Sequence, residues 1–267
     1  MTVDNSFIIK KLLKKTAVFA AFSVGSNMPY VVCDEETFND RTWIFENEEL
    51  LKKFAAEKAK DKIAIKGVKY PNKAFRTYFQ TLHMCGINEV VYQEEGREII
   101  LEPEQIEAKP DYDALPKERR PLVNEALQLT GMYFAQESTR PADVQDEDKL
   151  EEYQEELASN MLRATYLLPV IFKEGEGTPA EKIKNKQYTI PRVKMGESDF
   201  YIPVVSDAME LQKFAAGKPM AALPLNFSGL AKSLSGEVKG YMLNPAGYHL
   251  VMTKELLETL PQQFVEE

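Results

Sequence analysis

The chain has 267 residues, of which 44% are hydrophobic and 28% are charged, and this composition is typical of globular proteins. Its length is sufficient for two domains of about 100 residues each and a connector. The net charge of −9 disfavours a nucleic-acid-binding role, because such proteins neutralise phosphates with clustered basic residues.

The first predicted elements are a basic amphipathic segment and a short apolar run. Residues 10–15 followed by residues 17–25 have the outline of a signal peptide. However, apolar residues lie before and among the lysines, as on an amphipathic helix: Phe7, Ile8, Ile9, Leu12 and Leu13. The apolar run also has a counterpart inside the chain at residues 166–172. We therefore expect a helix followed by a β-strand. No apolar run approaches the roughly 20 residues that span a bilayer, so we expect no membrane partner.

The first half of the chain repeats the second half in a weaker form. Residues 50–56 align with residues 210–216, and residues 90–101 align with residues 241–252. The extra residues of the first copy are expected around residues 70–83. Gene duplication and convergence on one supersecondary pattern both account for this match. The shared order, the residue identities and the matching turn glycine favour a tandem duplication.

A different kind of sequence lies between the two copies. Residues 116–136 and 146–161 carry apolar side chains at helical spacing, and a proline, Pro141, separates them. Residues 110–160 contain thirteen acidic and five basic residues, a local net charge of −8. We expect a helical hairpin that packs on one or both domains and exposes an acidic face. A solvated helix surface is the commoner reason for such a charge.

Residues 200–260 give the clearest succession of elements. A strand at 200–205 contains Pro203, which cannot donate to a ladder, so we expect an edge strand or a strand start. Ser206 or Asp207 should cap the following helix, which Gly217 ends. The remaining elements are a strand at 220–225, a helix at 227–234 capped by Ser228, strands at 238–243 and 248–252 joined by a turn, and a final helix capped by Thr253. Helices mixed with a hairpin predict an α+β fold with mixed and antiparallel sheets and flanking helices.

The segment around Tyr201 and Pro203, together with the turn Asn244-Pro245-Ala246-Gly247, resembles the amino-terminal domain of the SseB family, the enhanced serine sensitivity proteins of bacteria. The resemblance extends over about residues 160–260. It implies a cytoplasmic protein without established catalytic residues, and it implies no activity. The motif residues are therefore interpreted as structural rather than catalytic: Tyr201, Pro203, Asn244, Pro245 and Gly247.

The resemblance also sets the expected domain organisation. Residues 161–267 are predicted to be an SseB N-terminal-like domain, and residues 1–109 a diverged SseB-like domain that lacks the Asn-Pro turn. Residues 110–160 are predicted to be the acidic helical connector. The chain would then carry two tandem SseB-like domains joined by a helical hairpin.

The candidates for chemistry are few. His83 and Cys85 form the single His/Cys cluster, and Cys33 and His249 are the remaining members of these residue types. A zinc site needs four ligands at recognisable spacing, which these residues lack, so no metal and no cofactor are expected. A cysteine nucleophile with a remote histidine is the catalytic alternative. The favoured interpretation makes both cysteines small apolar core residues next to strands, and two cysteines suit a reducing cytoplasm.

The leading hypothesis is a non-enzymatic cytoplasmic protein that acts by binding another protein. The alternative is a small-molecule-binding or enzymatic domain with its site at the junction of the two copies, because pockets often lie at domain interfaces. A deep polar pocket that contains His83, Cys85 or His249 would favour the alternative. An exposed apolar patch would favour a protein partner.

Overall fold

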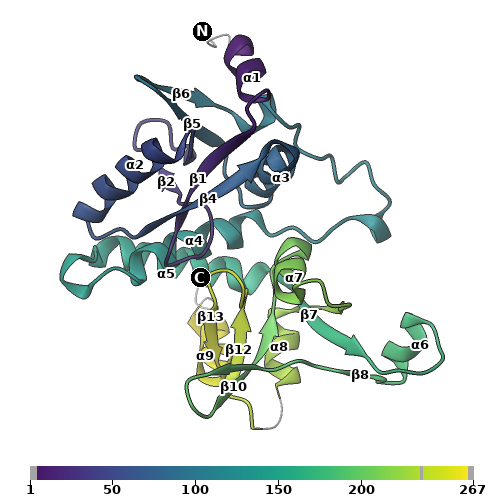
Figure 1. Ribbon diagram of the computed structural model, residues 1–267. Coiled ribbons are helices and arrows are strands. Elements are labelled where there is room, and N and C mark those ends of the chain that lie inside the picture. The colour runs from purple at the N-terminus through teal and green to yellow at the C-terminus, as the bar shows by residue number, and fades with distance from the viewer. Residues whose placement is uncertain (1–4, 235–236, 264–267) are drawn as a thin grey trace. The chain divides into compact units, whose positions relative to one another are not determined.

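The computed structural model describes residues 5–234 and 237–263. The chain forms two compact units, which we call unit 1 (residues 1–120 and 128–154) and unit 2 (residues 121–127 and 155–267). Helices and sheets are mixed in an α+β fold, as predicted (Figure 1). Across the described ranges, no helix is both long and apolar enough to cross a bilayer.

Unit 1 is built on a sheet with the strand order β4-β1-β3-β5-β6, and β2 pairs with β3. Its strands are β1 (Ala17–Ser23), β2 (Val32–Cys33), β3 (Asp40–Phe45), β4 (Ile65–Pro71), β5 (Glu89–Glu94) and β6 (Arg97–Leu101). Its helices are α1 (Ser6–Leu12), α2 (Glu48–Lys60) and α3 (Phe75–Met84), with short 3-10 turns at Asn72–Ala74, Pro103–Gln105, Lys117–Arg119 and Ala142–Val144. The apolar run at the amino terminus is therefore a strand, β1, as predicted.

The core of unit 1 explains how α2 is held on the sheet. Asn47 caps the helix by accepting a hydrogen bond from the Leu50 amide at 3.0 Å. Leu51 faces the sheet and is buried to 4% exposure. A Cβ atom on Gly67 of β4 would lie 2.2 Å from Leu51 Cδ2, so the absence of a side chain there lets the helix approach closely.

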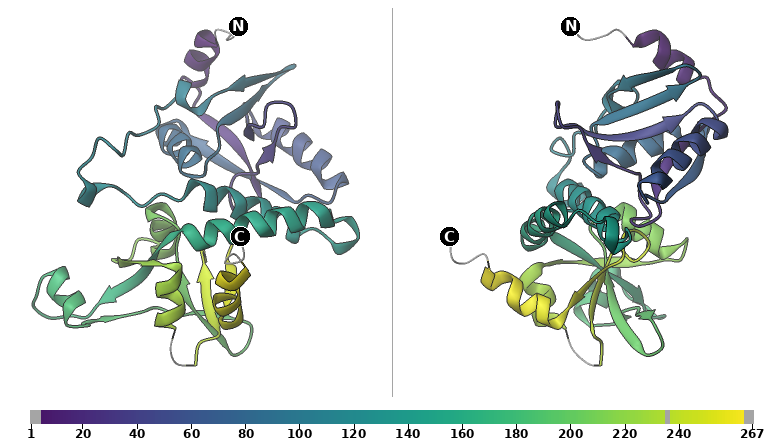
Figure 2. Two further views of the ribbon diagram at one scale, coloured as in Figure 1. Left: turned by 180° about the vertical axis from the view of Figure 1, so that it is seen from behind. Right: turned by 90° about the vertical axis from the view of Figure 1, so that its left-hand side faces the viewer.

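Two helices pass from one unit into the other. They are α4 (Glu125–Ser138) and α5 (Glu147–Arg163), and they are the two helices that the sequence predicted for the connector (Figure 2). Leu157 and Met161 of α5 are buried, which agrees with the predicted apolar stripe.

Unit 2 contains two short sheets, with the orders β13-β12-β10-β9 and β11-β7-β8. A bridge between Leu167 and Val205 connects them, through amide-to-carbonyl hydrogen bonds of 2.8 and 2.9 Å. The strands are β7 (Thr165–Phe172), β8 (Tyr188–Thr189), β9 (Val193–Met195), β10 (Asp199–Val204), β11 (Ala221–Asn226), β12 (Gly240–Leu243) and β13 (Leu250–Thr253). The helices are α6 (Pro179–Lys184), α7 (Ala208–Ala215), α8 (Phe227–Ser233) and α9 (Lys254–Gln263).

Two expectations for unit 2 were wrong. The strand with Pro203 is not at an edge, because β10 lies between β12 and β9. Its pairing with β9 ends at Tyr201 and its bridge to β7 is at Val205, so Pro203 falls in the gap where no donor is needed. The cap of α8 is also not Ser228. It is Asn226, whose Oδ1 accepts from the Gly229 amide at 2.8 Å.

The two units share one succession of strand pairings. In unit 1, β4 pairs with β1, β1 with β3, β3 in parallel with β5, and β5 with β6. In unit 2, β11, β7, β10, β12 and β13 follow the same order, with β10 and β12 parallel. A duplication predicts this correspondence, but convergence on one supersecondary pattern predicts it too. The tandem duplication therefore stays a prediction.

Candidate functional site

A buried group of polar side chains lies where β10, α7 and the turn after β12 meet in unit 2. Its members, which we call the polar cluster, are all 0% exposed: Ser206, Asp207, Glu210 and Asn244. Because β10 and β12 are parallel, their carboxyl ends meet at one edge of the sheet. In open sheets, ligand sites lie outside the carboxyl ends of parallel strands, so this edge is the candidate site.

Asn244 and Ser206 form the centre of the polar cluster. Asn244 Oδ1 accepts from the Ser206 amide at 2.8 Å, and Asn244 Nδ2 donates to Ser206 Oγ at 2.9 Å. Ser206 Oγ in turn donates to Asp207 Oδ2 at 2.8 Å. Asn244 adopts a φ of +48°, a left-handed conformation that asparagine tolerates better than most residues. The turn is thereby connected to the end of β10 by side-chain hydrogen bonds.

The two buried carboxylates of the polar cluster have local partners. Asp207 is the cap of α7, and its Oδ1 accepts from the amides of Met209 at 2.8 Å and Glu210 at 2.9 Å. Glu210 pairs with Lys213, whose Nζ lies 2.6 Å from Glu210 Oε1. A buried carboxylate without such partners would carry a large desolvation cost. These contacts therefore fix the first turn of α7 beside the sheet.

The turn after β12 closes directly over Glu210. The amides of Gly247 and His249 donate to the Asn244 carbonyl at 2.9 and 3.0 Å. A Cβ atom on Gly247 would lie 3.0 Å from Glu210 Oε2, which is tighter than ordinary contact. Glycine at 247 is therefore what allows the turn to lie against the buried carboxylate.

The five predicted motif residues take different parts in this arrangement. Asn244 belongs to the polar cluster, Gly247 contacts it, and Pro245 lies in the turn between them. Tyr201 and Pro203 are buried on β10, opposite Gly240 and Met242 of β12. The motif therefore marks the strand and the turn that the polar cluster joins.

Sequence reasoning missed one contributor, Asn124, which directly precedes α4. Its Nδ2 donates to the Thr165 carbonyl at 2.8 Å and to the Ser206 carbonyl at 2.5 Å. An asparagine before a helix is typical of a cap, so the sequence carries no signal for these distant partners. Asn124 links β7 to the polar cluster.

Comparison with known families identifies this part of the chain. Residues 143–259 match the family model of the SseB protein N-terminal domain. This part of the chain is thus similar to the SseB protein N-terminal domain, and on that likeness unit 2 is called the SseB N-terminal domain below. The match begins before residue 161 and includes α5, which the sequence assigned to the connector.

Two solved structures were also found among similar folds, at low similarity. Anabaena Tic22, described as a protein transport protein, is 10% identical with a TM-score of 0.21, covering 89% of this chain and 88% of its own. Tic22 from Plasmodium falciparum is 13% identical with a TM-score of 0.21, covering 96% of this chain and 98% of its own. TM-scores of this size carry no argument about function. No curated protein matches the chain.

Unit 1 has different chemistry at the position that the polar cluster takes in the SseB N-terminal domain. Here β3 and β5 are the parallel pair, and Glu46 and Glu94 lie at their carboxyl ends. Lys15 pairs with Glu46, and Lys11 Nζ lies 2.5 Å from Glu94 Oε2. Arg97 is a second partner of Glu94. The side chains of Lys11 on α1 and Lys15 after it therefore take the place that the Asn244 amide and the Ser206 hydroxyl have in unit 2.

These ion pairs control the acidity of both carboxyl groups. Burial raises the pKa of Glu94, but the hydrogen bonds from Lys11 and Arg97 outweigh it and hold that pKa below its usual value. The hydrogen bond from Lys15 likewise lowers the pKa of Glu46. Both groups therefore favour the ionised state in the folded protein.

The histidine and cysteine candidates lie in both units. In unit 1, Cys85 is 0% exposed and His83 is 6% exposed, with its Nε2 2.7 Å from the Glu107 carbonyl oxygen. In the SseB N-terminal domain, His249 lies with Nδ1 3.2 Å from the Gly247 carbonyl oxygen. Cys33, on β2, is exposed, so the prediction that it is a core residue was wrong. Partial desolvation and nearby carboxylates raise the pKa of Cys33, which disfavours its thiolate. Within residues 5–234 and 237–263, no group of three or more His, Cys, Asp or Glu could hold a metal ion.

The acidic face predicted for the connector is exposed. We use this name for the exposed carboxylates on and before α5: Asp143, Asp146, Glu147, Asp148, Glu151, Glu152, Glu155 and Glu156. Lys149 is the one basic residue in residues 143–156, so these eight carboxylates leave a local net charge of −7. The opposite side of the helix carries the buried Leu157 and Met161.

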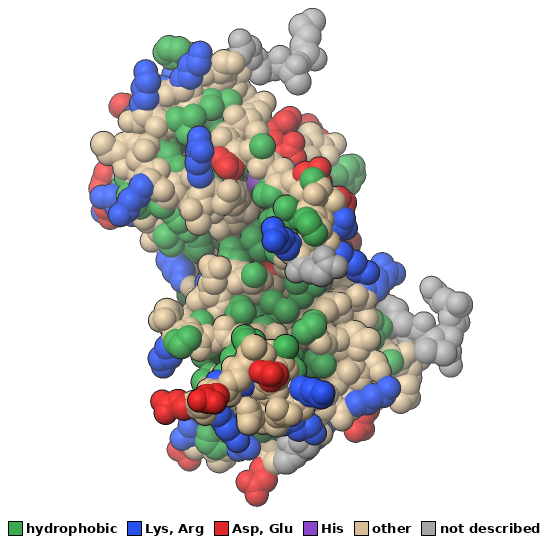
Figure 3. Space-filling model, turned by 90° about the vertical axis from the view of Figure 1, so that its right-hand side faces the viewer, with side chains coloured by type: hydrophobic (Ala, Val, Ile, Leu, Met, Phe, Trp, Pro, Cys, Tyr) green, Lys and Arg blue, Asp and Glu red, His purple; other side chains and the backbone are tan. Residues whose placement is uncertain are grey.

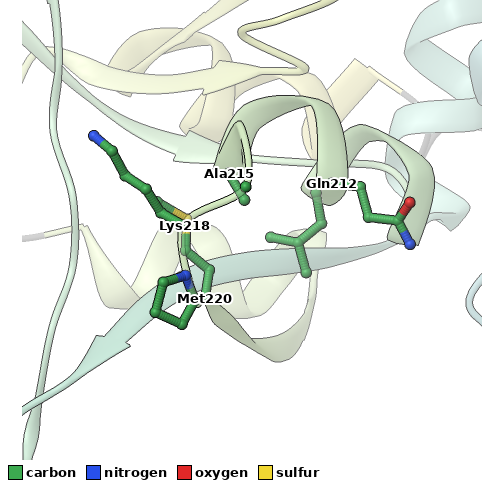
Figure 4. A pocket seen from close by; sticks show the side chains of 7 residues that line it. Gln212, Ala215, Lys218 and Met220 are labelled. Atoms are coloured by element: carbon green, nitrogen blue, oxygen red, sulfur yellow. The ribbon is translucent and has the colours of Figure 1, made fainter.

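The SseB N-terminal domain also exposes apolar surface. A cavity of about 410 Å³ lies at the end of α7 (Figure 4), lined by Leu211, Gln212, Ala215, Gly217, Lys218, Pro219 and Met220. Large apolar side chains are also exposed on the strands of this domain, on a loop and on α6: Ile171, Ile183, Ile190, Met195 and Phe200. Figure 3 shows a face on which hydrophobic side chains gather. The lining of the cavity at the end of α7 is mostly apolar and holds one lysine, so this cavity suits binding better than acid–base chemistry.

Proposed function

We propose that this chain is a non-enzymatic module that binds another protein through the acidic face. The observation that carries the proposal is the set of eight exposed carboxylates on and before α5, which have a local net charge of −7. The helix α5 has 17 residues and so extends about 25 Å, a length comparable with a protein interface.

The charge indicates what kind of partner would bind. A surface of one sign attracts a partner of the opposite sign, raises the association rate and opposes wrong partners. The partner is therefore a protein with a basic surface. The buried Leu157 and Met161 hold α5 in place, so the carboxylates are presented by a packed helix rather than by a loose segment.

The polar cluster has a supporting role in this proposal. Ser206, Asp207 and Asn244 bond to one another and to the backbone, and Glu210 pairs with Lys213. These side chains fix the turn and the start of α7 within unit 2, to which residues 155–163 of α5 also belong. Cytoplasmic location belongs to the same proposal and follows from the resemblance alone.

The test is affinity purification of the full chain from its native host, with mass spectrometry and metabolite extraction of the eluate. The variant Glu151→Gln/Glu152→Gln/Glu155→Gln keeps side-chain size while it removes three charges from the acidic face. A control variant, Glu57→Gln/Glu98→Gln/Glu258→Gln, removes the same charge from exposed positions elsewhere. We expect one stoichiometric protein partner that the first variant loses and the control retains.

Two results would overturn the proposal. Equal recovery of the partner with both variants would show that the acidic face is only a solvated helix surface. An eluate that contains no protein partner but a small molecule bound to the chain would favour the small-molecule-binding or enzymatic alternative.

A further inference from the structure

The outer strand of the unit 1 sheet, β4, has a free backbone edge. All seven residues of β4 are in register with β1 on one side, from Ile65 opposite Ser23 to Pro71 opposite Ala17. In the strand order β4-β1-β3-β5-β6, no described strand lies on its other side. An edge of this kind presents unpaired amides and carbonyls to a further strand.

The hydrogen bonds on either side of β4 show which of its residues face outward. The Ala64 carbonyl accepts from the Val24 amide at 2.9 Å, and the Asn72 amide donates to the Thr16 carbonyl at 2.9 Å. Even-numbered residues therefore bond to β1, because the direction alternates along an antiparallel strand. The odd-numbered residues Ile65, Gly67 and Lys69 direct both their amide and their carbonyl outward, whereas Pro71 has a carbonyl alone.

The opposite edge of the sheet, on β6, is partly occupied by a side chain. The Asn5 side chain donates through Nδ2 to the carbonyl of Ile100 on β6 at 2.9 Å, so part of that edge is already occupied. Among the described residues, the outward groups of β4 have no such partner. The edge of β4 is thus the more available of the two.

Basic residues surround the free edge. Residues 58–76 contain seven basic residues and one acidic residue, Asp61, for a local net charge of +6 in a chain whose net charge is −9. The exposed members along and beside β4 are Lys60, Lys62, Lys66, Lys69, Lys73 and Arg76. An acidic occupant would complement this charge.

We propose that the outer edge of β4 adds an extended acidic segment of another protein as a further strand. The segment's backbone pairs with Ile65, Gly67 and Lys69, and its carboxylates contact the surrounding lysines. Pro71 ends the ladder at the carboxyl end of β4, because it has no amide to donate. This surface is in unit 1 and does not depend on the acidic face.

Two other occupants fit the edge less well. A second copy paired through β4 would place the Lys66 and Lys69 side chains of both copies along one short ladder, where like charges repel. A nucleic acid would satisfy the lysines but not the alternating amides and carbonyls. Lysines and a proline also protect edge strands from unwanted pairing, as do short or bulged strands. The seven residues of β4 pair in an unbroken register.

The experiment uses the full chain and a fluorescent peptide of about ten residues that alternates glutamate with threonine. A second peptide has the same sequence but carries N-methyl groups on alternate amides, so it keeps its charge and loses its donors. A single-stranded RNA of equal charge is the third probe. We expect the methylated peptide to bind at least about tenfold more weakly than the first. Amide resonances of Ile65, Gly67 and Lys69 should shift on binding of the first peptide.

Variants locate the site without disturbing the fold. Lys62→Gln/Lys73→Gln removes two exposed charges beside β4, and Lys53→Gln/Lys184→Gln removes two exposed charges elsewhere. The first variant should weaken peptide binding several-fold more than the second. Equal binding of the two peptides, tighter binding of the RNA, or equal effects of the two variants would each overturn the proposal. Resonance shifts confined to residues outside β4 would overturn it as well.

Discussion

The side chain of Asn244 offers the most direct test of the polar cluster. Two substitutions separate its two contributions, the hydrogen bonds of its amide and its tolerance of a positive φ. Asn244→Ala removes the hydrogen bonds and leaves at a φ of +48° a residue that lacks asparagine's tolerance of this conformation. Asn244→Gly removes the same hydrogen bonds, but glycine adopts this φ without steric cost.

The expected magnitudes follow from the contacts. Either variant leaves the buried Ser206 amide, now 2.8 Å from Asn244 Oδ1, without its acceptor, at a cost of about 1–3 kcal/mol. Alanine adds about 1–2 kcal/mol for the left-handed conformation. Glycine avoids that strain but costs roughly 0.5–1 kcal/mol of conformational entropy. We therefore expect a loss of about 2–5 kcal/mol for Asn244→Ala and a loss smaller by about 0.5–1 kcal/mol for Asn244→Gly.

The assay is urea denaturation followed by far-ultraviolet circular dichroism, with hydrogen exchange at the Ser206 amide as a local readout. Both variants should lower the midpoint and speed exchange at that amide. The control Asn226→Ala removes one hydrogen bond at an exposed helix cap, to the Gly229 amide at 2.8 Å, and should cost about 1 kcal/mol. Stability within about 0.5 kcal/mol of wild type for both Asn244 variants, or a glycine variant less stable than the alanine variant, would refute the reasoning.

Two further predictions concern unit 1, where fluorescence of Trp43, the single tryptophan, reports unfolding. Gly67→Ala places a Cβ 2.2 Å from Leu51 Cδ2 and should lower the free energy of unfolding by about 1–3 kcal/mol through overpacking. The same substitution should cost clearly less in a Leu51→Ala background, and equal costs in both backgrounds would contradict this contact. The pKa of Glu94 is lowered in the folded state, so its stabilisation is present above the unfolded pKa and is lost as the pH falls through the folded value. Glu94→Gln should therefore flatten the loss of stability between about pH 5 and 3, and an unchanged slope would disprove it.

The regular elements could be predicted because their signals are local. The strand that became β10, the cap of α7 at Asp207 and the turn at Asn244 each depend on residues close together in the chain. The end of α7 was misplaced, because the helix ends at Ala215 and its left-handed cap is Ala216 rather than Gly217. The same holds for Thr253, whose Oγ1 accepts from the Leu256 amide at 3.1 Å at the start of α9. Fold class follows from the order of such elements, so it was predicted correctly.

The polar cluster could not be predicted because its contacts are distant in sequence. Ser206 and Asn244 are 38 residues apart, and Asn124 reaches a carbonyl 82 residues away. Glu210 is a charged residue in the first turn of α7, where no sequence signal marks it for burial, yet it is 0% exposed. The prediction of an edge strand from Pro203 failed for a related reason. On one side of β10, the pairing with β9 ends before Pro203 and the bridge to β7 begins after it, so the missing amide of Pro203 faces a gap.

The junction at the carboxyl ends of the parallel strands has different chemistry in the two units. In unit 2 this junction depends on an amide, a hydroxyl and a glycine at Asn244, Ser206 and Gly247, and these are motif positions or their partners. In unit 1 the corresponding strands end in Glu46 and Glu94, which are held by charges instead. Two units with one strand order can thus use unrelated side chains to close the same junction. The family match over residues 143–259 includes this junction of unit 2, and the strands of unit 1 lie outside it.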